Sequence, residues 1–191
     1  ILSINMIKQA CIIVGCSIKG LLLLAQHYAY INADVHLGTG KRIYPAVLIT
    51  QQDKIESVQS QQGFKINPTG FDSIIDFFGS KLALEKLSGK ADLVLGNNVL
   101  AHVPDINDFV KGVKIALKPD GVNTFEFPHL LQLVSYNQFD TIYHEHFSYL
   151  SLTNLVSVFE KQGLEIFDVQ ELPTHGGSLR IFSKHRDDVS K

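Results

Sequence analysis

The stretch Ala91-Asp92-Leu93-Val94-Leu95-Gly96-Asn97-Asn98 is the part of the chain that decides the fold. Its apolar residues predict a buried strand, which Gly96-Asn97-Asn98 ends. A helix is expected after Pro104-Asp105, because apolar residues recur at helical spacing at Ile106, Phe109, Val110, Val113 and Leu117. Lys-Pro-Asp-Gly at 118–121 then predicts a turn, and residues 122–127 predict the next strand. A strand–helix–strand unit indicates an α/β fold, in which ligands lie beyond the carboxyl ends of parallel strands.

The beginning of the chain has a similar pattern. Residues 10–14 predict a buried strand, Gly15 a turn, and residues 18–30 a helix. Many nucleotide-binding domains open in this way, with the backbone close to the ligand; a plain tight turn is the alternative. Gly15 and Gly20 are therefore candidate cofactor-binding residues. Asp34 follows where a ribose-binding acid often lies, although the spacing is loose and an ordinary turn residue also fits.

The segment between these two units has weaker patterns. Residues 30–35 and 44–50 each predict a strand, and residues 53–62 predict an exposed polar helix. Residues 73–87 predict a helix that packs against the sheet, because apolar side chains recur along it.

The last third of the chain completes the α/β pattern. Residues 130–134 predict a short helix. Thr153 is expected to cap a longer helix, which Gly163 ends. Residues 164–169 and 178–182 predict two final strands, joined by a loop whose backbone amides are available to an anion.

Size and composition limit the function classes. The chain has 191 residues, enough for one domain with a sizeable core. Its 17 basic and 19 acidic side chains give a net charge of -2, which offers no electrostatic reason to expect a nucleic-acid or acidic-membrane partner. Cys11 and Cys16 make no disulfide framework, so the reducing cytoplasm is the expected location. The apolar runs are too short for a bilayer span, and no leader peptide is recognised.

The chemical groups concentrate in Tyr143-His144-Glu145-His146. Imidazole exchanges protons near neutral pH, a phenol can donate to an oxyanion, and Glu145 could fix the tautomer of either histidine. A solvated face is one alternative. A metal site is another, since His144 and His146 would point the same way on a strand, but nothing nearby completes a ligand set.

Further polar residues fall at the predicted carboxyl ends of strands. Asn97, Asn98 and His102 follow the strand quoted above, and Glu126 lies near the end of the next strand. Turn chemistry is the alternative for the two asparagines, and a structural role is the alternative for His102.

Four motifs together resemble the sugar C-methyltransferase family: residues 97–105, 117–121, 139–149 and 173–180. The resemblance covers roughly residues 71–185. It implies a Rossmann-like class I methyltransferase fold: an α/β fold with a mostly parallel sheet, an antiparallel final strand and helices on both faces. It also implies that S-adenosylmethionine is the cofactor and that a nucleotide-linked keto-sugar is methylated on carbon.

The resemblance has limits along the chain. Ile13 stands where the family has an acid before its first glycine, and residues 1–70 match poorly. The family's cysteine-rich zinc module and its further α/β domain have no counterpart. We therefore expect a methyltransferase core over residues 1–185, with 186–191 as a tail or the start of another domain. The sequence does not indicate an oligomeric state.

The resemblance implies a role for each candidate residue. His146 is the base that removes the proton next to the ketone, with Tyr143 as runner-up, Glu145 orienting the imidazole and His102 bonding the keto oxygen. Asn97 and Asn98 lie where cofactor or substrate meets the sheet. The residues expected to contact the nucleotide sugar are His175, Gly176, Gly177, Ser178 and Glu126.

Three rival functions stay open at this point: a ligand-binding remnant without chemistry, a small-molecule O-methyltransferase, and a nicotinamide-dependent oxidoreductase. The last requires a better glycine fingerprint than residues 15–20 offer. The sugar-binding loop argues mildly against the O-methyltransferase. Binding of S-adenosylmethionine separates the remnant from the enzymes.

Overall fold

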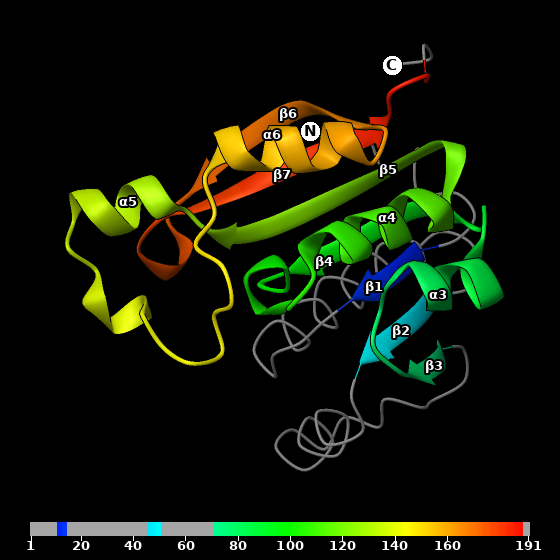
Figure 1. Ribbon diagram of the computed structural model, residues 1–191, viewed down its shortest axis with the longest axis horizontal. Coiled ribbons are helices and arrows are strands. Elements are labelled where there is room, and N and C mark those ends of the chain that lie inside the picture. The colour runs from blue at the N-terminus through cyan, green and yellow to red at the C-terminus, as the bar shows by residue number, and fades with distance from the viewer. Residues whose placement is uncertain (1–10, 15–45, 51–70, 189–191) are drawn as a thin grey trace, which may run out of the picture.

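The computed structural model describes residues 11–14, 46–50 and 71–188 (Figure 1). The strands and helices in chain order, with η for short 3-10 or π turns, are β1 (Cys11–Val14), β2 (Ala46–Thr50), β3 (Phe71–Ile75), α3 (Ser80–Leu82), η2 (Ala83–Leu87), β4 (Ala91–Asn97), η3 (Leu100–His102), α4 (Ile106–Ala116), β5 (Leu117–Pro128), α5 (Leu130–Ser135), η4 (Phe139–Thr141), α6 (Leu152–Lys161), β6 (Leu164–Leu172), η5 (Thr174–Gly176) and β7 (Ser178–His185).

The described strands form one sheet in the order β3-β2-β1-β4-β5-β7-β6. The pairs from β3 to β5 are all parallel, and β7 is antiparallel to both of its neighbours. The predicted fold class, a mostly parallel α/β sheet with an antiparallel final strand, is confirmed. Because β1, β4 and β5 are parallel, their carboxyl ends meet at one edge, which we call the carboxyl edge.

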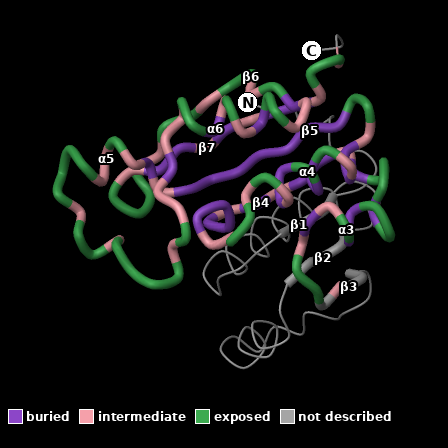
Figure 2. Tube along the Cα trace, in the orientation of Figure 1, coloured by how far each residue is buried: buried purple, intermediate pink, exposed green. Residues whose placement is uncertain are grey.

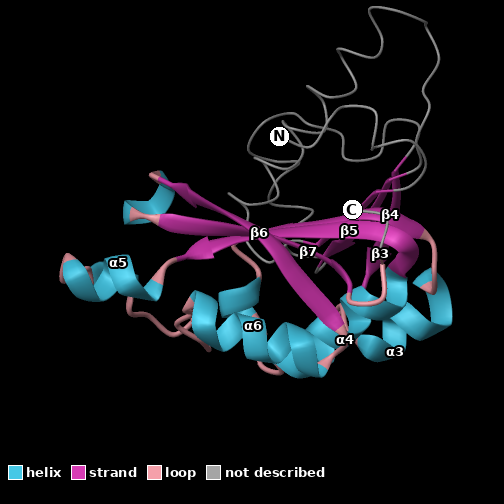
Figure 3. Ribbon diagram, turned by 90° about the horizontal axis from the view of Figure 1, so that it is seen from above, coloured by secondary structure: helices cyan, strands magenta, loops and turns pink. Residues whose placement is uncertain are grey.

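Helices α3, α4 and α6 cover one face of the sheet (Figure 3). The α4 helix begins where the sequence predicts, since the Asp105 side chain accepts hydrogen bonds from the Asn107 and Asp108 amides at 3.0 Å. For α6 the N-cap is Ser151, which accepts from the Asn154 amide, and not Thr153 as predicted. The helices expected at 18–30 and 53–62 lie outside the described residues, as does the strand expected at 30–35.

Strand β5 is buried along most of its length (Figure 2), and its Phe125 belongs to the core between the sheet and this helical layer. Its ring is fully buried and packs against Phe109 of α4 at 5.6 Å and Phe159 of α6 at 6.4 Å between ring centroids. A Cβ at Gly96 would lie 2.5 Å from the Phe125 ring, so only glycine lets β4 approach β5 here. This packing holds the carboxyl ends of β4 and β5 in fixed positions.

The prediction of a helix over residues 73–87 is wrong in its first part. Phe71–Ile75 is strand β3, which pairs in parallel with β2, and helical structure begins only at Ser80. Neighbouring β-branched residues at Ile74 and Ile75 favour a strand, and a short apolar run does not distinguish the two structures by periodicity. Leu82 and Leu87 are buried as the helical pattern requires, whereas Leu84 is 67% exposed.

The predicted turn at 118–121 is not a separate connection. Pairing of β4 with β5 passes from Ala91–Leu117 to Leu93–Val122, so the residues between Leu117 and Val122 bulge out of a continuous β5. Gly121 lies so close to the Ala91 carbonyl that a Cβ would be 2.7 Å from it. The Pro-Asp-Gly sequence therefore forms a bulge within β5, and not a turn between two elements.

Among the described residues, no helix has the length and apolar character that a membrane crossing requires. The cytoplasmic location stays a prediction.

Candidate active site

The histidine-rich segment lies at the carboxyl edge, against the turn that follows β4. The amides of Phe147 and Ser148 both donate to the Ala101 carbonyl, at 2.8 and 3.2 Å. Ala101 belongs to η3, directly after the end of β4. Two segments that are far apart in the sequence are thus fixed side by side.

The rings of three predicted catalytic residues come together here. The His146 ring lies 4.2 Å from Tyr143 and 4.8 Å from His102, measured between centroids. Tyr149, for which the sequence predicted no role, also contacts His146, edge to face at 5.8 Å. Tyr149 is an aromatic residue only three positions after His146, and this short separation is the signal that could have identified it.

The orientation of His146 is set by the backbone. Its Nδ1 lies 2.9 Å from the Thr141 carbonyl oxygen. A carbonyl can only accept, so the neutral ring carries its proton on Nδ1 and leaves Nε2 as an unprotonated acceptor. His146 also lines a pocket with Ala101, Pro128, Leu130, Leu133, Thr141, Ser148 and Tyr149.

Glu145 has a different place from the one predicted. Its side chain is exposed, and within the described part of the chain His146 donates its orienting hydrogen bond to the Thr141 carbonyl. The segment is a turn and not a strand, so the strand geometry on which the alternative metal site of His144 and His146 depended is not present. Burial first, then the charge of Glu145 and the nearby Tyr149, raise the pKa of the Tyr143 phenol above its ordinary value. Tyr143 is therefore a hydrogen-bond donor at neutral pH.

Asn97 and Asn98 lie at the end of β4, where Val14 of β1 pairs opposite Gly96. Asn98 has left-handed backbone (φ 53°), which the turn interpretation predicts, and its amide donates to the Glu126 carbonyl at 2.7 Å. Asn98 is 8% exposed, and its Oδ1 has no hydrogen-bond partner among the described residues.

A buried acceptor without a partner at this edge fits the ammonium and hydroxyl donors of S-adenosylmethionine. The edge beyond β1 and β4 therefore suits this cofactor, with Asn98 as the described residue that would contact it. Gly15, Gly20 and Asp34, the other predicted cofactor residues, lie outside the described residues.

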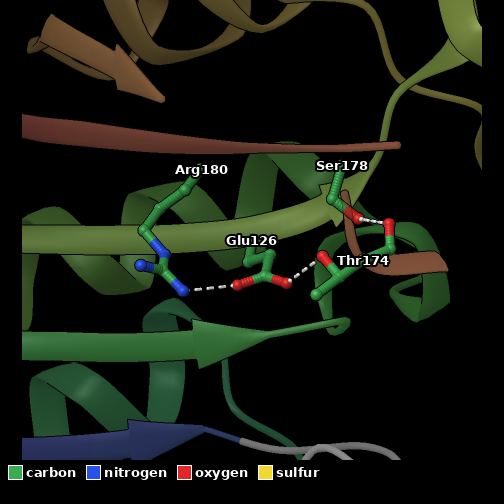
Figure 4. Close-up of polar contacts among 4 residues, drawn as sticks. All are labelled: Glu126, Thr174, Ser178 and Arg180. Carbon is green, nitrogen blue, oxygen red and sulfur yellow. Dashed lines mark hydrogen bonds and ion pairs between the residues drawn. The ribbon is translucent and has the colours of Figure 1, made fainter. Parts of the chain in front are cut away.

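The loop at 174–178 is held against β5 by a buried carboxylate (Figure 4). Glu126 Oε1 accepts from the Thr174 hydroxyl at 2.8 Å, and Oε2 forms an ion pair with Arg180 Nη2 at 2.6 Å. The Ser178 hydroxyl donates to the Thr174 carbonyl at 2.9 Å. Glu126 and Ser178, predicted to bind substrate, thus have intramolecular partners, whereas His175 is exposed. Thr174 and Arg180 lie within the 173–180 motif, but no role was predicted for either residue.

The described residues contain no group of three or more His, Cys, Asp or Glu side chains placed to hold a metal ion.

Comparison with known proteins shows the family of the chain. Residues 25–169 match the methyltransferase domain family, so the chain belongs to that family. The predicted class, an S-adenosylmethionine-dependent methyltransferase, is confirmed, and the nicotinamide-dependent alternative is set aside.

Within this class, the chain is similar to the C-methyltransferase NovU of Streptomyces niveus. The two are 38% identical over 153 residues, which are 80% of this chain and 35% of NovU. The chain therefore spans about a third of the length of this relative.

Solved structures share the fold. An S-adenosylmethionine-dependent methyltransferase from Mesorhizobium loti has a TM-score of 0.63 at 14% identity, covering 95% of this chain and 94% of its own. The PH0226 protein of Pyrococcus horikoshii has a TM-score of 0.64 at 14% identity, covering 92% and 81%. At such low identity the likeness is one of fold.

Proposed function

We propose that this chain transfers a methyl group from S-adenosylmethionine to a carbon next to the ketone of a nucleotide-linked deoxy-keto-sugar. The observation that carries the proposal is the contact of the His102 and Tyr143 rings with His146, which itself lines a pocket beyond the carboxyl ends of β4 and β5. Similarity to NovU, a C-methyltransferase, supports methylation on carbon. The motif resemblance described above supports the nucleotide-linked keto-sugar.

Carbon methylation needs a base and an oxyanion donor in one place, because a proton next to a ketone is only weakly acidic. His146 supplies the base: with Nδ1 directed at the Thr141 carbonyl, Nε2 accepts the proton. His102 or Tyr143 donates a hydrogen bond to the enolate oxygen. S-adenosylmethionine, when bound, would supply an electrophilic methyl group for the enolate carbon, with the electron pair of the broken sulfur–methyl bond going to sulfur and S-adenosylhomocysteine as the leaving group.

The raised pKa of Tyr143 fits this division of roles. Because its pKa is raised, the Tyr143 phenol keeps its proton at neutral pH. A protonated phenol can donate a hydrogen bond to an oxyanion but is a poor acceptor for the substrate's proton. The geometry therefore favours His146 as base and leaves Tyr143 as the donor.

The test is exchange of the substrate's own proton, which needs no methyl transfer. In deuterated buffer the unaltered protein should exchange the hydrogen next to the ketone of a nucleotide-linked keto-sugar. His146→Ala should lower that rate about 100- to 10,000-fold, the usual contribution of a positioned base. His144→Ala is the matched control, because His144 is exposed in the same tetrapeptide. Equal exchange by His146→Ala and unaltered protein would reject the mechanism.

The same experiment addresses the two remaining rivals. An O-methyltransferase has no reason to exchange a carbon-bound hydrogen, so methyl transfer without exchange would favour that function. A ligand-binding remnant would exchange nothing. Calorimetric titration with S-adenosylmethionine then shows whether such a remnant still binds the cofactor.

A further inference from the structure

We infer that Glu126 is a positioning residue: through the Thr174 hydroxyl it sets the conformation of the 174–178 loop that presents His175 to the substrate. The inference rests on the proposed function in one respect, that this loop contacts the nucleotide sugar. It assigns Glu126 no contact with substrate, unlike the role first predicted.

The ion pair follows from the strand register. Glu126 of β5 and Arg180 of β7 are direct partners in the antiparallel pair, so their side chains lie on the same face of the sheet. Glu126 is only 5% exposed, and a buried carboxylate needs both a counter-charge and hydrogen bonds. Arg180 supplies the charge at Oε2, and Thr174 supplies the second donor at Oε1.

The backbone of the 174–178 loop has an unfavourable conformation that neighbouring contacts must stabilise. His175, Gly176 and Gly177 have φ values of 53°, 76° and 121° in succession. A left-handed histidine is costly and persists only where its surroundings determine it. Such conformations concentrate at functional sites.

Several bonds to the loop come from neighbouring backbone and from one amide side chain. The Thr174 carbonyl accepts from the Gly177 amide at 2.9 Å, the Gly176 carbonyl from Gln138 Nε2 at 2.7 Å, and the Gly177 carbonyl from the His129 amide at 3.0 Å. His129 and Gln138 flank α5, which leads into the histidine-rich segment. The loop thus joins β5 to the proposed active site.

The bond from Thr174 to Glu126 differs from these because its acceptor is charged. Hydrogen bonds to an ionised group are about twice as strong as neutral ones. Removing the Thr174 hydroxyl would also leave Oε1 of a buried carboxylate without a donor. This contact is therefore the one whose loss should release the residue next to it, His175.

The experiment compares Thr174→Val with Thr174→Ser in the whole chain. Valine keeps the shape and removes the hydroxyl, while serine restores it. Thr153→Val is the matched control, because Thr153 is exposed at the start of α6. Two readouts are needed: hydrogen exchange of the Gly177 and His129 amides by NMR, and KM and kcat with a nucleotide-linked keto-sugar.

Thr174→Val should speed exchange of both amides about 10-fold and raise KM for the sugar about 5- to 10-fold, with kcat within about twofold, as expected for losing a charged hydrogen bond. Thr174→Ser and Thr153→Val should match the unaltered protein. Glu126→Gln should act in the same direction as Thr174→Val.

Unchanged exchange in Thr174→Val would overturn the inference at its base, since the loop would then not depend on Glu126. Faster exchange with unchanged KM would overturn the positioning role. Failure of the proposed function has a separate signature: the unaltered protein would turn over no nucleotide sugar, while amide exchange would still decide whether Glu126 holds the loop.

Discussion

The two edges of the sheet carry similar ion pairs in different settings. At the amino edge Lys118 and Asp92 lie 2.7 Å apart, with side chains 25% and 21% exposed. At the carboxyl edge Arg180 and Glu126 lie 2.6 Å apart, with side chains 29% and 7% exposed. Only the second pair buries its carboxylate and gives it a further donor. The carboxyl edge thus holds a desolvated charge, which costs stability unless it is paired.

The backbone shows the same difference. Where the described chain enters β4 and β6 at the amino edge, the left-handed positions are glycines, Gly89 and Gly163. At the carboxyl edge, positive φ values occur at Gly176 and Gly177 and also at two residues that are not glycine, Asn98 and His175. Non-glycine residues in such conformations cost about 1–3 kcal/mol each. This conformational cost is therefore present at the carboxyl edge, where ligands bind in this fold, and glycines avoid it at the amino edge.

The largest expected effect comes from removing the proposed base at the carboxyl edge. His146→Ala should lower methyl transfer about 100- to 10,000-fold, because it removes the proposed base. Among the described residues at the pocket, only His146 is held by the Thr141 carbonyl so that it presents an unprotonated nitrogen. The midpoint of thermal unfolding should change little, since His146 is part-exposed. Steady-state kinetics and calorimetry measure the two. A large loss of stability would mean that His146 is structural.

The two ion pairs can be compared directly by removing each cation. Arg180→Met leaves the Glu126 carboxylate buried without its counter-charge and should lower the free energy of unfolding by about 2–3 kcal/mol. Lys118→Met leaves a part-exposed Asp92 and should cost about 1 kcal/mol or less. Urea denaturation at pH 7 measures both. Equal costs would show that burial does not separate the two edges.

Backbone conformation offers a smaller contrast. Gly163→Ala introduces a Cβ at φ 77° and should cost about 1–2 kcal/mol of unfolding free energy. His175→Gly relieves a left-handed side chain at the other edge and should leave stability unchanged or slightly higher. Urea denaturation measures the change in unfolding free energy for both variants. A destabilised His175→Gly variant would mean that the His175 side chain supports the fold.

The smallest effect concerns Tyr143. Glu145→Gln removes a negative charge and should lower the pKa of the phenol, which stays above 10 because burial is the larger cause. With a pKa raised in the folded state, Tyr143 contributes stability that is present below pH 10 and is lost as pH rises through the folded pKa. An NMR titration of the Tyr143 ring measures the shift. A phenol pKa unaffected by Glu145→Gln would exclude that coupling.

Local patterns were sufficient for the central unit. Asp105 caps α4, the apolar spacing selects its buried face, and Gly163 ends α6 with a left-handed residue, all within a few neighbouring residues. They were insufficient for residues 73–87 and 118–121, where a strand and a bulge follow from pairing with distant segments. Periodicity over a handful of residues does not contain that information.

The sequence by itself determined the family, the order of most described elements and the identity of the imidazole and phenol groups, because each depends on neighbouring residues. Only the tertiary structure decided which of them meet. The ring cluster of His102, Tyr143 and His146, the contact of His146 with Thr141 in place of Glu145, and the Glu126–Arg180 pair all depend on strand register and loop packing. These contacts join residues brought together by the fold, and their partners are specified by three-dimensional packing that no local pattern encodes.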